Sequence, residues 1–318
     1  MSEKLAQVLR HWSEDFLEHL DLGGYSPATL RVYRCDLGLL CEWVKEQEHL
    51  NSPGDLTTAH LERYQMHLML RPSLHPRRSH PRTLSAGSRN RSLAALRSFF
   101  RYLKKSCRLL SNPALDLETA KQPKRVPSAI YSVPEMARLL QQIPKNHAVG
   151  LRDWAAVELL YGTALRRNEL LSLELTDLRL AEGFLRVLGK GNRERVLPLG
   201  NAAQRALTVY LERGRPKLAS EKAGTALLLS GVHGGRVTVH ELLDALKQHA
   251  HQAGIRKKVG FHAFRHTAAT HLLRGGADLR CIQALLGHSD LKSTSIYTRV
   301  EVSDLQKTLQ RYHPRERT

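Results

Sequence analysis

Two short polar segments in the second half of the chain contain residue types that could do chemistry. TALRRNEL contains Arg166 and, three residues later, Glu169. FHAFRHTAATHLL contains His262 and Arg265, and their spacing of three residues places both side chains on one face of a helix. Because guanidinium groups bind phosphate oxygens and imidazoles transfer protons, both segments are candidates for an active site.

Two further segments add a phenol and an amine. LLGHSDLKSTSIYTRV contains His288 and, nine residues later, Tyr297, while the turn GKGNR contains Lys190. Taken singly, each of these residues has an ordinary structural explanation. Arg166 could form a solvated ion pair with Glu169, Tyr297 could pack between helices, and lysines are common in turns. The four segments are therefore informative only in combination.

A metal site is not expected from the histidines. His262 and His266 are four residues apart, and Cys281 follows, which could suggest metal ligands. However, no carboxylate or third ligand has a recognisable metal-site spacing, and Arg265 between the two histidines would repel a cation.

The first 120 residues have the periodicity of helices. Apolar residues at three- and four-residue steps, including Leu5, Val8 and Trp12, predict a first helix that ends at Gly23–Gly24. Ser26–Pro27 predicts the start of a second helix, Thr57 or Thr58 caps a third, and Leu93 to Leu103 mark a fourth. The segment 71–91 has six arginines and no acidic residue, and its prolines and serines predict a loop that contacts phosphates.

The second half is expected to be mostly helical with a small antiparallel sheet. KQPKRVPSA (121–129) is basic and aperiodic, which indicates an interdomain linker, and Ser132–Glu135 forms a capping box. A long helix is predicted over about 150–171, followed by a β-hairpin formed by 184–189 and 194–199. Thr238–Glu241 predicts another capping box, and Gly275–Gly276 and Gly287 occupy positions typical of helix C-caps.

The charge of the chain indicates a polyanionic partner. The 318 residues include 49 Lys+Arg and 30 Asp+Glu, a formal net charge of +19, while the hydrophobic fraction of 42% is ordinary for globular domains. Nucleic acid is the first candidate and an anionic membrane surface the second. No signal peptide and no apolar run of membrane-spanning length are found, so we expect a cytoplasmic protein with no membrane association.

In their order and with their flanking residues, the polar segments resemble the tyrosine recombinases of the phage-integrase type, most closely the Xer-like site-specific recombinases. GKGNRERVLPL, HAFRHTAATHLL and LLGHSDLKSTSIYTRV carry the most specific resemblance, and YSPATLRVYRCDLGLLCEWV resembles the family's N-terminal helices. Ala164 departs from the family, which usually has glycine before Leu165. The resemblance covers nearly the whole chain.

The resemblance implies a role for each matching residue. Tyr297 is the nucleophile that would form a 3′-phosphotyrosine with DNA, and His262 would accept its proton, since a free phenol has a pKa near 10. Lys190 would protonate the leaving 5′-hydroxyl. Glu169, the acidic residue beside Arg166, would orient and support the site rather than react. The phosphate oxygens would be bound by Arg166, Arg265 and His288.

The resemblance also implies the fold, the partners and the absence of cofactors. The fold is expected to be mainly α: a helical N-terminal DNA-binding domain (1–120), a basic linker (121–131) and an α+β catalytic domain (132–318) with a C-terminal helix for protomer exchange. The phosphotyrosine conserves the bond energy, so neither ATP nor metal is expected. The expected partner is nucleoid double-stranded DNA with paired inverted recombinase-binding sites, bound by a homotetramer or a heterotetramer with a related recombinase. The residues expected to contact DNA are Arg77, Arg78, Arg82, Arg89, Arg91, Lys121, Lys124 and Arg125.

Two other functions are compatible with parts of this sequence pattern. A type IB-like topoisomerase shares the tyrosine chemistry but relaxes supercoils as a monomer, and the Xer-like N-terminal segment argues against it. A DNA-binding protein that keeps the fold without catalysis is the other alternative, and the intact set of polar residues argues against that. The pattern is compatible with chromosome-dimer resolution, plasmid resolution and movement of a phage or transposable element alike.

Overall fold

A computed structural model describes residues 2–47, 49–72, 83–121, 129–189, 194–287 and 302–316. The chain divides into two compact units, an N-terminal unit (1–125) and a C-terminal unit (126–318). Tyr131, at the end of the segment predicted as a linker, is fully buried in the core of the C-terminal unit. The predicted functional residues that lie outside the described residues are Arg77, Arg78, Arg82, Lys124, Arg125, Lys190, His288 and Tyr297.

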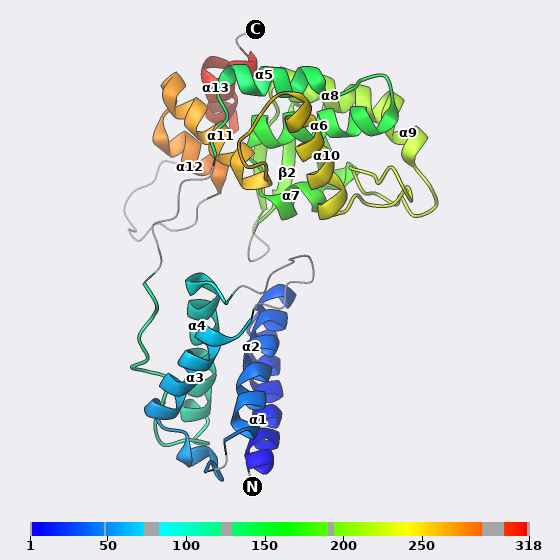
Figure 1. The fold of residues 1–318 in the computed structure, drawn as a ribbon. Coiled ribbons are helices and arrows are strands. Elements are labelled where there is room, and N and C mark those ends of the chain that lie inside the picture. The colour runs from blue at the N-terminus through cyan, green and yellow to red at the C-terminus, as the bar shows by residue number, and fades with distance from the viewer. Residues whose placement is uncertain are drawn as a thin grey trace. The chain divides into compact units, whose positions relative to one another are not determined.

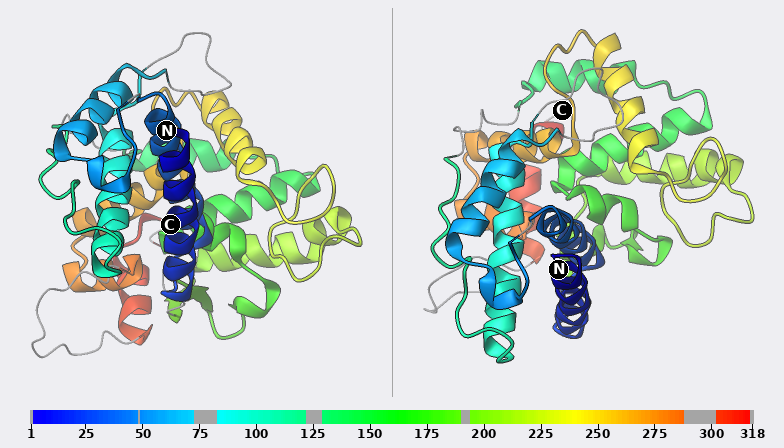
Figure 2. Two further views of the ribbon diagram at one scale, coloured as in Figure 1. Left: turned by 90° about the horizontal axis from the view of Figure 1, so that it is seen from below. Right: turned by 60° about the horizontal axis from the view of Figure 1, so that its bottom comes forward.

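The N-terminal unit is a helical bundle in which α1 and α2 lie side by side (Figures 1 and 2). The start of α2 is as predicted, because Ser26 accepts a hydrogen bond from the backbone of Thr29 and Pro27 occupies the first turn. The core combines aromatic rings from all four α-helices that the structure describes in this unit, among them Phe16, Trp43, Tyr64 and Phe99. The helices are α1 (Ser2–Leu22), α2 (Pro27–Lys45), η1 (Pro53–Asp55), α3 (Thr58–Leu70) and α4 (Ala86–Lys105).

Two details of the N-terminal prediction are wrong. Leu9, not Val8, continues the buried stripe of α1, and Val8 is 37% exposed. The basic segment 71–91 is not a loop throughout, because α4 begins at Ala86 with Ser85 as its cap. Arg89 and Arg91 are therefore helical residues, held in fixed positions rather than on a loop.

The C-terminal unit is built around α6, which is buried nearly all round. Its buried residues lie on every face and are mostly apolar, although Arg152, Asp153 and Glu158 are buried with them. The helix packs against α8, α11 and the π-helical turn η3 (Tyr210–Gly214). Figure 1 shows α6, α8, α11 and the strand β2 in this unit. Besides η3, the helices of this unit in the described residues are α5 (Val133–Gln142), α6 (Ala148–Thr163), α7 (Arg167–Ser172), η2 (Leu175–Asp177), α8 (Asn201–Val209), α9 (Arg215–Leu218), α10 (Val239–Gln252), α11 (Phe261–Gly275), α12 (Leu279–Leu286), α13 (Val302–Tyr312) and η4 (Pro314–Glu316).

The predicted hairpin is present and has a third strand. The antiparallel order is β1 (Leu178–Arg179), β2 (Phe184–Leu188) and β3 (Glu194–Pro198). Leu185 pairs with Leu197, and both are buried, so this face of the hairpin packs on the core. Two residues further along β2, Val187 pairs with Arg195. Arg195 therefore lies on the same buried face as Leu185 and Leu197.

The long helix predicted over 150–171 is broken. α6 ends at Thr163, Ala164 adopts a left-handed conformation (φ 53°), and α7 begins at Arg167. Left-handed backbone is costly for a residue with a β-carbon, which explains why glycine is usual at this position in the family that the sequence resembles. The break makes Arg166 the N-cap residue of α7, and its backbone N–H donates a hydrogen bond to the Glu169 carboxylate in the first turn of that helix.

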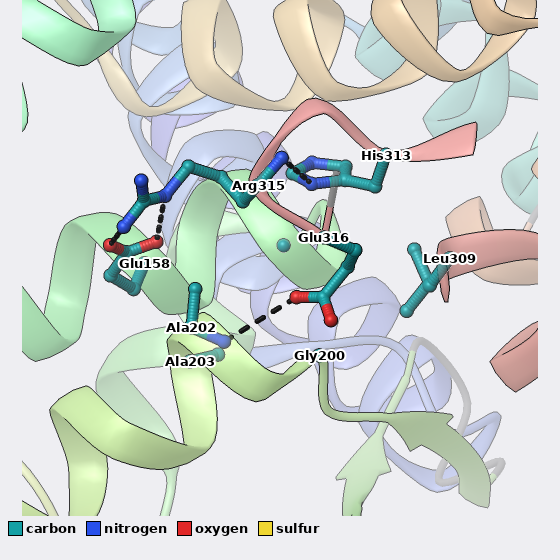
Figure 3. A pocket seen from close by; sticks show the side chains of 9 residues that line it. Glu158, Gly200, Ala202, Ala203, Leu309, His313, Arg315 and Glu316 are labelled. Carbon is teal, nitrogen blue, oxygen red and sulfur yellow. Dashed lines mark hydrogen bonds and ion pairs between the residues drawn. The ribbon is translucent and has the colours of Figure 1, made fainter. Parts of the chain in front are cut away.

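The C-terminal segment packs on its own unit. Leu305 and Leu309 of α13 are buried, and the Arg315 guanidinium forms two hydrogen bonds with the buried Glu158 carboxylate. The Glu316 carboxylate accepts hydrogen bonds from the backbone N–H groups of Asn201 and Ala202, at the N-terminus of α8. Figure 3 shows Glu158, Arg315 and Glu316 around one small pocket. In the described part of the chain, no helix has the length and apolar character needed to cross a membrane.

Candidate active site

Arg166 and Glu169 form the first part of the site, at the break between α6 and α7. The Glu169 carboxylate accepts hydrogen bonds from the backbone N–H of Arg166 (2.7 Å) and from its Nη1 (2.8 Å). The Glu169 side chain is 6% exposed and that of Arg166 is 37% exposed. The pair is therefore not the solvated surface pair that a helical spacing of three residues alone would suggest.

Arg195 completes this cluster and was not identified from the sequence. Its Nη1 and Nη2 donate to the two oxygens of Glu169 at 2.8 and 2.9 Å, a bidentate pair. The sequence contains an indication of this role, because the two-residue alternation of a strand places Arg195 on the same face as the apolar Leu197. A charged residue on an apolar strand face requires a buried partner of opposite charge.

Arg265 approaches the same region from α11. Its guanidinium donates to the backbone carbonyl of Ala164 at 2.7 Å and to that of Leu286, and the residue is 8% exposed. Arg166 donates through Nη2 to the carbonyl of Gly287 at 2.9 Å. The two arginines that the sequence predicted thus meet at the C-terminal turn of α12, formed by Leu286 and Gly287, immediately before His288 in the chain.

Burial and the neighbouring charges shift the pKa values of this cluster. Burial alone would raise the pKa of Glu169, but the hydrogen bonds from Arg195 and Arg166 outweigh it and lower the pKa to about 2. Burial, followed by the charge of Arg166, lowers the pKa of Arg265 to about 10. Both groups therefore stay charged at neutral pH.

His262 lies one helical turn before Arg265 on α11, as predicted. Its side chain is exposed, and partial burial followed by the charge of Arg265 lowers its pKa from the ordinary value of 6.5. The imidazole is therefore neutral at neutral pH, which is the form that accepts a proton. Within the described residues, no group of three or more His, Cys, Asp or Glu side chains could hold a metal ion.

Three of the residues expected to contact DNA are described by the structure, Arg89, Arg91 and Lys121, and all three lie in the N-terminal unit. Arg91 is exposed on α4 and forms an ion pair with the buried Asp36 at 3.4 Å, while Lys121 is exposed after α4. Arg89 lines a pocket of about 200 Å³ with the apolar side chains of Leu68 and Leu93. These positions leave Arg91 and Lys121 accessible to a phosphate backbone.

Comparison with protein families identifies both units. The phage integrase family matches residues 132–303, and the phage integrase N-terminal SAM-like domain matches residues 14–106. The chain belongs to the phage integrase family. The resemblance to tyrosine recombinases is thus confirmed, as is the mainly helical fold with a SAM-like N-terminal unit and a small three-stranded antiparallel sheet.

Individual members of the family are similar over almost the whole chain. The tyrosine recombinase XerD of Listeria monocytogenes is 36% identical over 303 residues, which cover 95% of this chain and 98% of the relative. The tyrosine recombinase XerC 2 of Ralstonia nicotianae is 38% identical over 311 residues, which cover 96% of this chain and 86% of the relative. Like these relatives, the chain is a tyrosine recombinase, an enzyme of site-specific DNA recombination.

Solved structures of recombinases share the fold. XerH site-specific recombinase bound to its palindromic difH substrate, in a post-cleavage complex, matches with a TM-score of 0.64 at 20% identity, covering 98% of this chain and 84% of that one. A lambda integrase tetramer bound to a Holliday junction matches with a TM-score of 0.60 at 17% identity, covering 92% of this chain and 80% of that one.

Proposed function

We propose that the chain recombines DNA by cleaving one strand with Tyr297 and rejoining it through a 3′-phosphotyrosine, without ATP or metal. The observation that carries this proposal is the meeting of Arg166 and Arg265 at the C-terminal turn of α12. His288 follows this turn directly and Tyr297 nine residues later, and the family match (132–303) includes both.

The chemistry follows from the residue types. Attack on a phosphodiester adds negative charge to the non-bridging oxygens, and the guanidiniums of Arg166 and Arg265 offer paired donors to them. His288 donates a further hydrogen bond to the same phosphate. The neutral imidazole of His262 accepts the phenolic proton of Tyr297. Lys190, which lies between β2 and β3 in the chain, donates a proton to the leaving 5′-oxygen as the P–O bond breaks, which releases a 5′-hydroxyl. Attack of a second 5′-hydroxyl on the phosphotyrosine reverses the reaction and reseals the strand.

The working assembly that we propose is a tetramer of this chain, or of this chain with a related recombinase, on double-stranded DNA with paired inverted sites. Basic residues of the N-terminal unit and the linker neutralise backbone phosphates there, in the cytoplasm on the nucleoid. In the assembly, the segment 302–316 would leave its own unit and occupy the same acceptor surface on a neighbour. Glu158 and the N-terminus of α8 form that surface, because they already bind Arg315 and Glu316 in cis.

Covalent trapping tests the proposed reaction. The purified protein is incubated with sheared genomic DNA and denatured, and the DNA that stays attached is sequenced to locate the site. A duplex with this site and a nick near the cleavage point then loses a short 5′-hydroxyl fragment on cleavage, which traps the adduct.

We expect Tyr297→Phe to bind the duplex as tightly as the wild type and to form no adduct, because the change removes one hydroxyl. Tyr312→Phe, which alters a tyrosine of α13 in the same unit, is the matched control and should form the adduct at the normal rate. An adduct with Tyr297→Phe would place the nucleophile elsewhere. If the wild-type protein forms no adduct on any DNA, the proposed reaction is wrong.

A further inference from the structure

We propose that Arg195 is a positioning residue of this site, which holds Arg166 in its phosphate-binding orientation by occupying Glu169. This inference rests on the proposed function. Arg195 comes from β3, whereas Arg166 and Glu169 come from the α6–α7 break, so the contact joins the sheet to the catalytic arginine. Arg195 itself is 16% exposed and does not need to touch the substrate to act.

The geometry explains why Glu169 needs a second arginine. The Arg195 guanidinium takes both carboxylate oxygens, whereas the Arg166 guanidinium reaches only Oε1, through Nη1, and its backbone N–H donates to Oε2. The Nη2 of Arg166 is thereby left to point away from Glu169, toward the carbonyl of Gly287. Without Arg195, the buried carboxylate would be under-neutralised, and the favoured arrangement would be a bidentate pair with Arg166. That rearrangement would withdraw Nη2 from the turn before His288, where the proposed function places the phosphate.

Arg195 also contacts the turn that leads to His288. A β-carbon built on Gly287 would lie 3.1 Å from Cζ and from Nε of Arg195, so the guanidinium packs directly on the backbone of this turn. Gly287 is left-handed (φ 62°), which permits this close approach. The Nε atom is buried and has no hydrogen-bond partner among the described residues, so the packing and the Glu169 pair are the contacts that place this guanidinium.

A double-mutant cycle tests the proposal on the nicked duplex described above. Single-turnover rates of adduct formation are measured for the wild type, Arg195→Met, Arg166→Ala and the double variant. We expect Arg195→Met to react at least tenfold more slowly, with a Kd for DNA within threefold of the wild type. Since Arg195 acts through Arg166, the double variant should react no more than threefold more slowly than Arg166→Ala alone. Independent, multiplying effects of the two substitutions would overturn the proposal.

A conservative variant and a control separate positioning from folding. Arg195→Lys keeps the charge, but a single ammonium nitrogen cannot reproduce the planar pairing of two nitrogens with the two oxygens of Glu169, so we expect it to fold normally and still react at least tenfold more slowly. Arg186→Met removes a half-exposed arginine of β2 that pairs with Asp177 and Glu194, and it should react like the wild type. A wild-type rate for Arg195→Lys would overturn the proposal, because charge alone would then suffice. A wild-type protein that forms no adduct refutes the proposed function instead.

Discussion

Glu169→Gln should destabilise the C-terminal unit by about 3 kcal/mol at pH 7. The carboxylate accepts four hydrogen bonds, two from Arg166 and two from Arg195, and an amide with one acceptor oxygen can keep only two of them. Two lost bonds to charged groups cost about 3–6 kcal/mol, and the partial exposure of Arg166 reduces this figure. The shift of the Glu169 pKa from 4.5 to about 2 corresponds independently to about 3 kcal/mol.

The pH dependence provides a sharper test than the magnitude. The pKa of Glu169 is depressed in the folded protein, so its stabilisation is complete above the unfolded value of 4.5 and is lost as the pH falls toward 2. The difference between wild type and variant should therefore shrink by about 1.4 kcal/mol between pH 7 and pH 3.5. A difference that does not change with pH would refute the reasoning, and so would a variant as stable as the wild type at pH 7.

The assay is urea unfolding followed by tryptophan fluorescence. The chain has three tryptophans, and Trp12→Phe with Trp43→Phe leaves Trp154 of α6 as the sole reporter of the C-terminal unit. Glu174→Gln is the matched control, because its ion pair with Arg236 is about 40% exposed on both sides. Such a pair contributes about 0–1 kcal/mol, so the control should stay close to the wild type.

Three further outcomes are expected. The acidic loss of the rate of adduct formation should have its midpoint below pH 6.5, because the pKa of His262 is lowered from its ordinary value of 6.5; a rate already halved at pH 6.5 would contradict this. Arg315→Met should lower the free energy of unfolding by about 3 kcal/mol, because it strands the buried Glu158 carboxylate, and adding Glu158→Gln should recover part of the loss. The salt dependence of DNA affinity should lose about one unit of slope per phosphate contact removed, alike on specific and non-specific DNA, when alanine replaces Arg77, Arg78 and Arg82.

Elements with local chemical signals were predictable from the sequence. The caps Ser26 and Ser132 start helices where expected, and Gly276 and Gly287 end them in left-handed conformations. The hairpin followed from two alternating strands around a polar turn. In each case a few neighbouring residues determine the backbone, so tertiary contacts were not needed to infer it.

The features that build the site depend on contacts distant in sequence. The apolar pattern continues through Leu165 and Leu170, both fully buried, so it gives no indication that the helix breaks at Ala164. α4 was predicted to start too late because its first turns, AGSRNR, have no apolar residue to mark a period. Arg195 looked like one more charge in a basic hairpin; strand alternation gives the face on which it lies, but its partner Glu169 is 26 residues away in the chain.

The balance of charge in the cluster links its structure to the proposed chemistry. Three guanidiniums, those of Arg166, Arg195 and Arg265, surround the single carboxylate of Glu169. The positive charge of Arg265 is costly in the DNA-free protein, because burial first and the charge of Arg166 second lower its pKa. The carbonyls of Ala164, Leu286 and Gly287 offset part of this cost by accepting hydrogen bonds from the arginines. A phosphate gains negative charge as it is attacked, so the same excess charge stabilises the transition state more than the bound substrate, which is the requirement for catalysis.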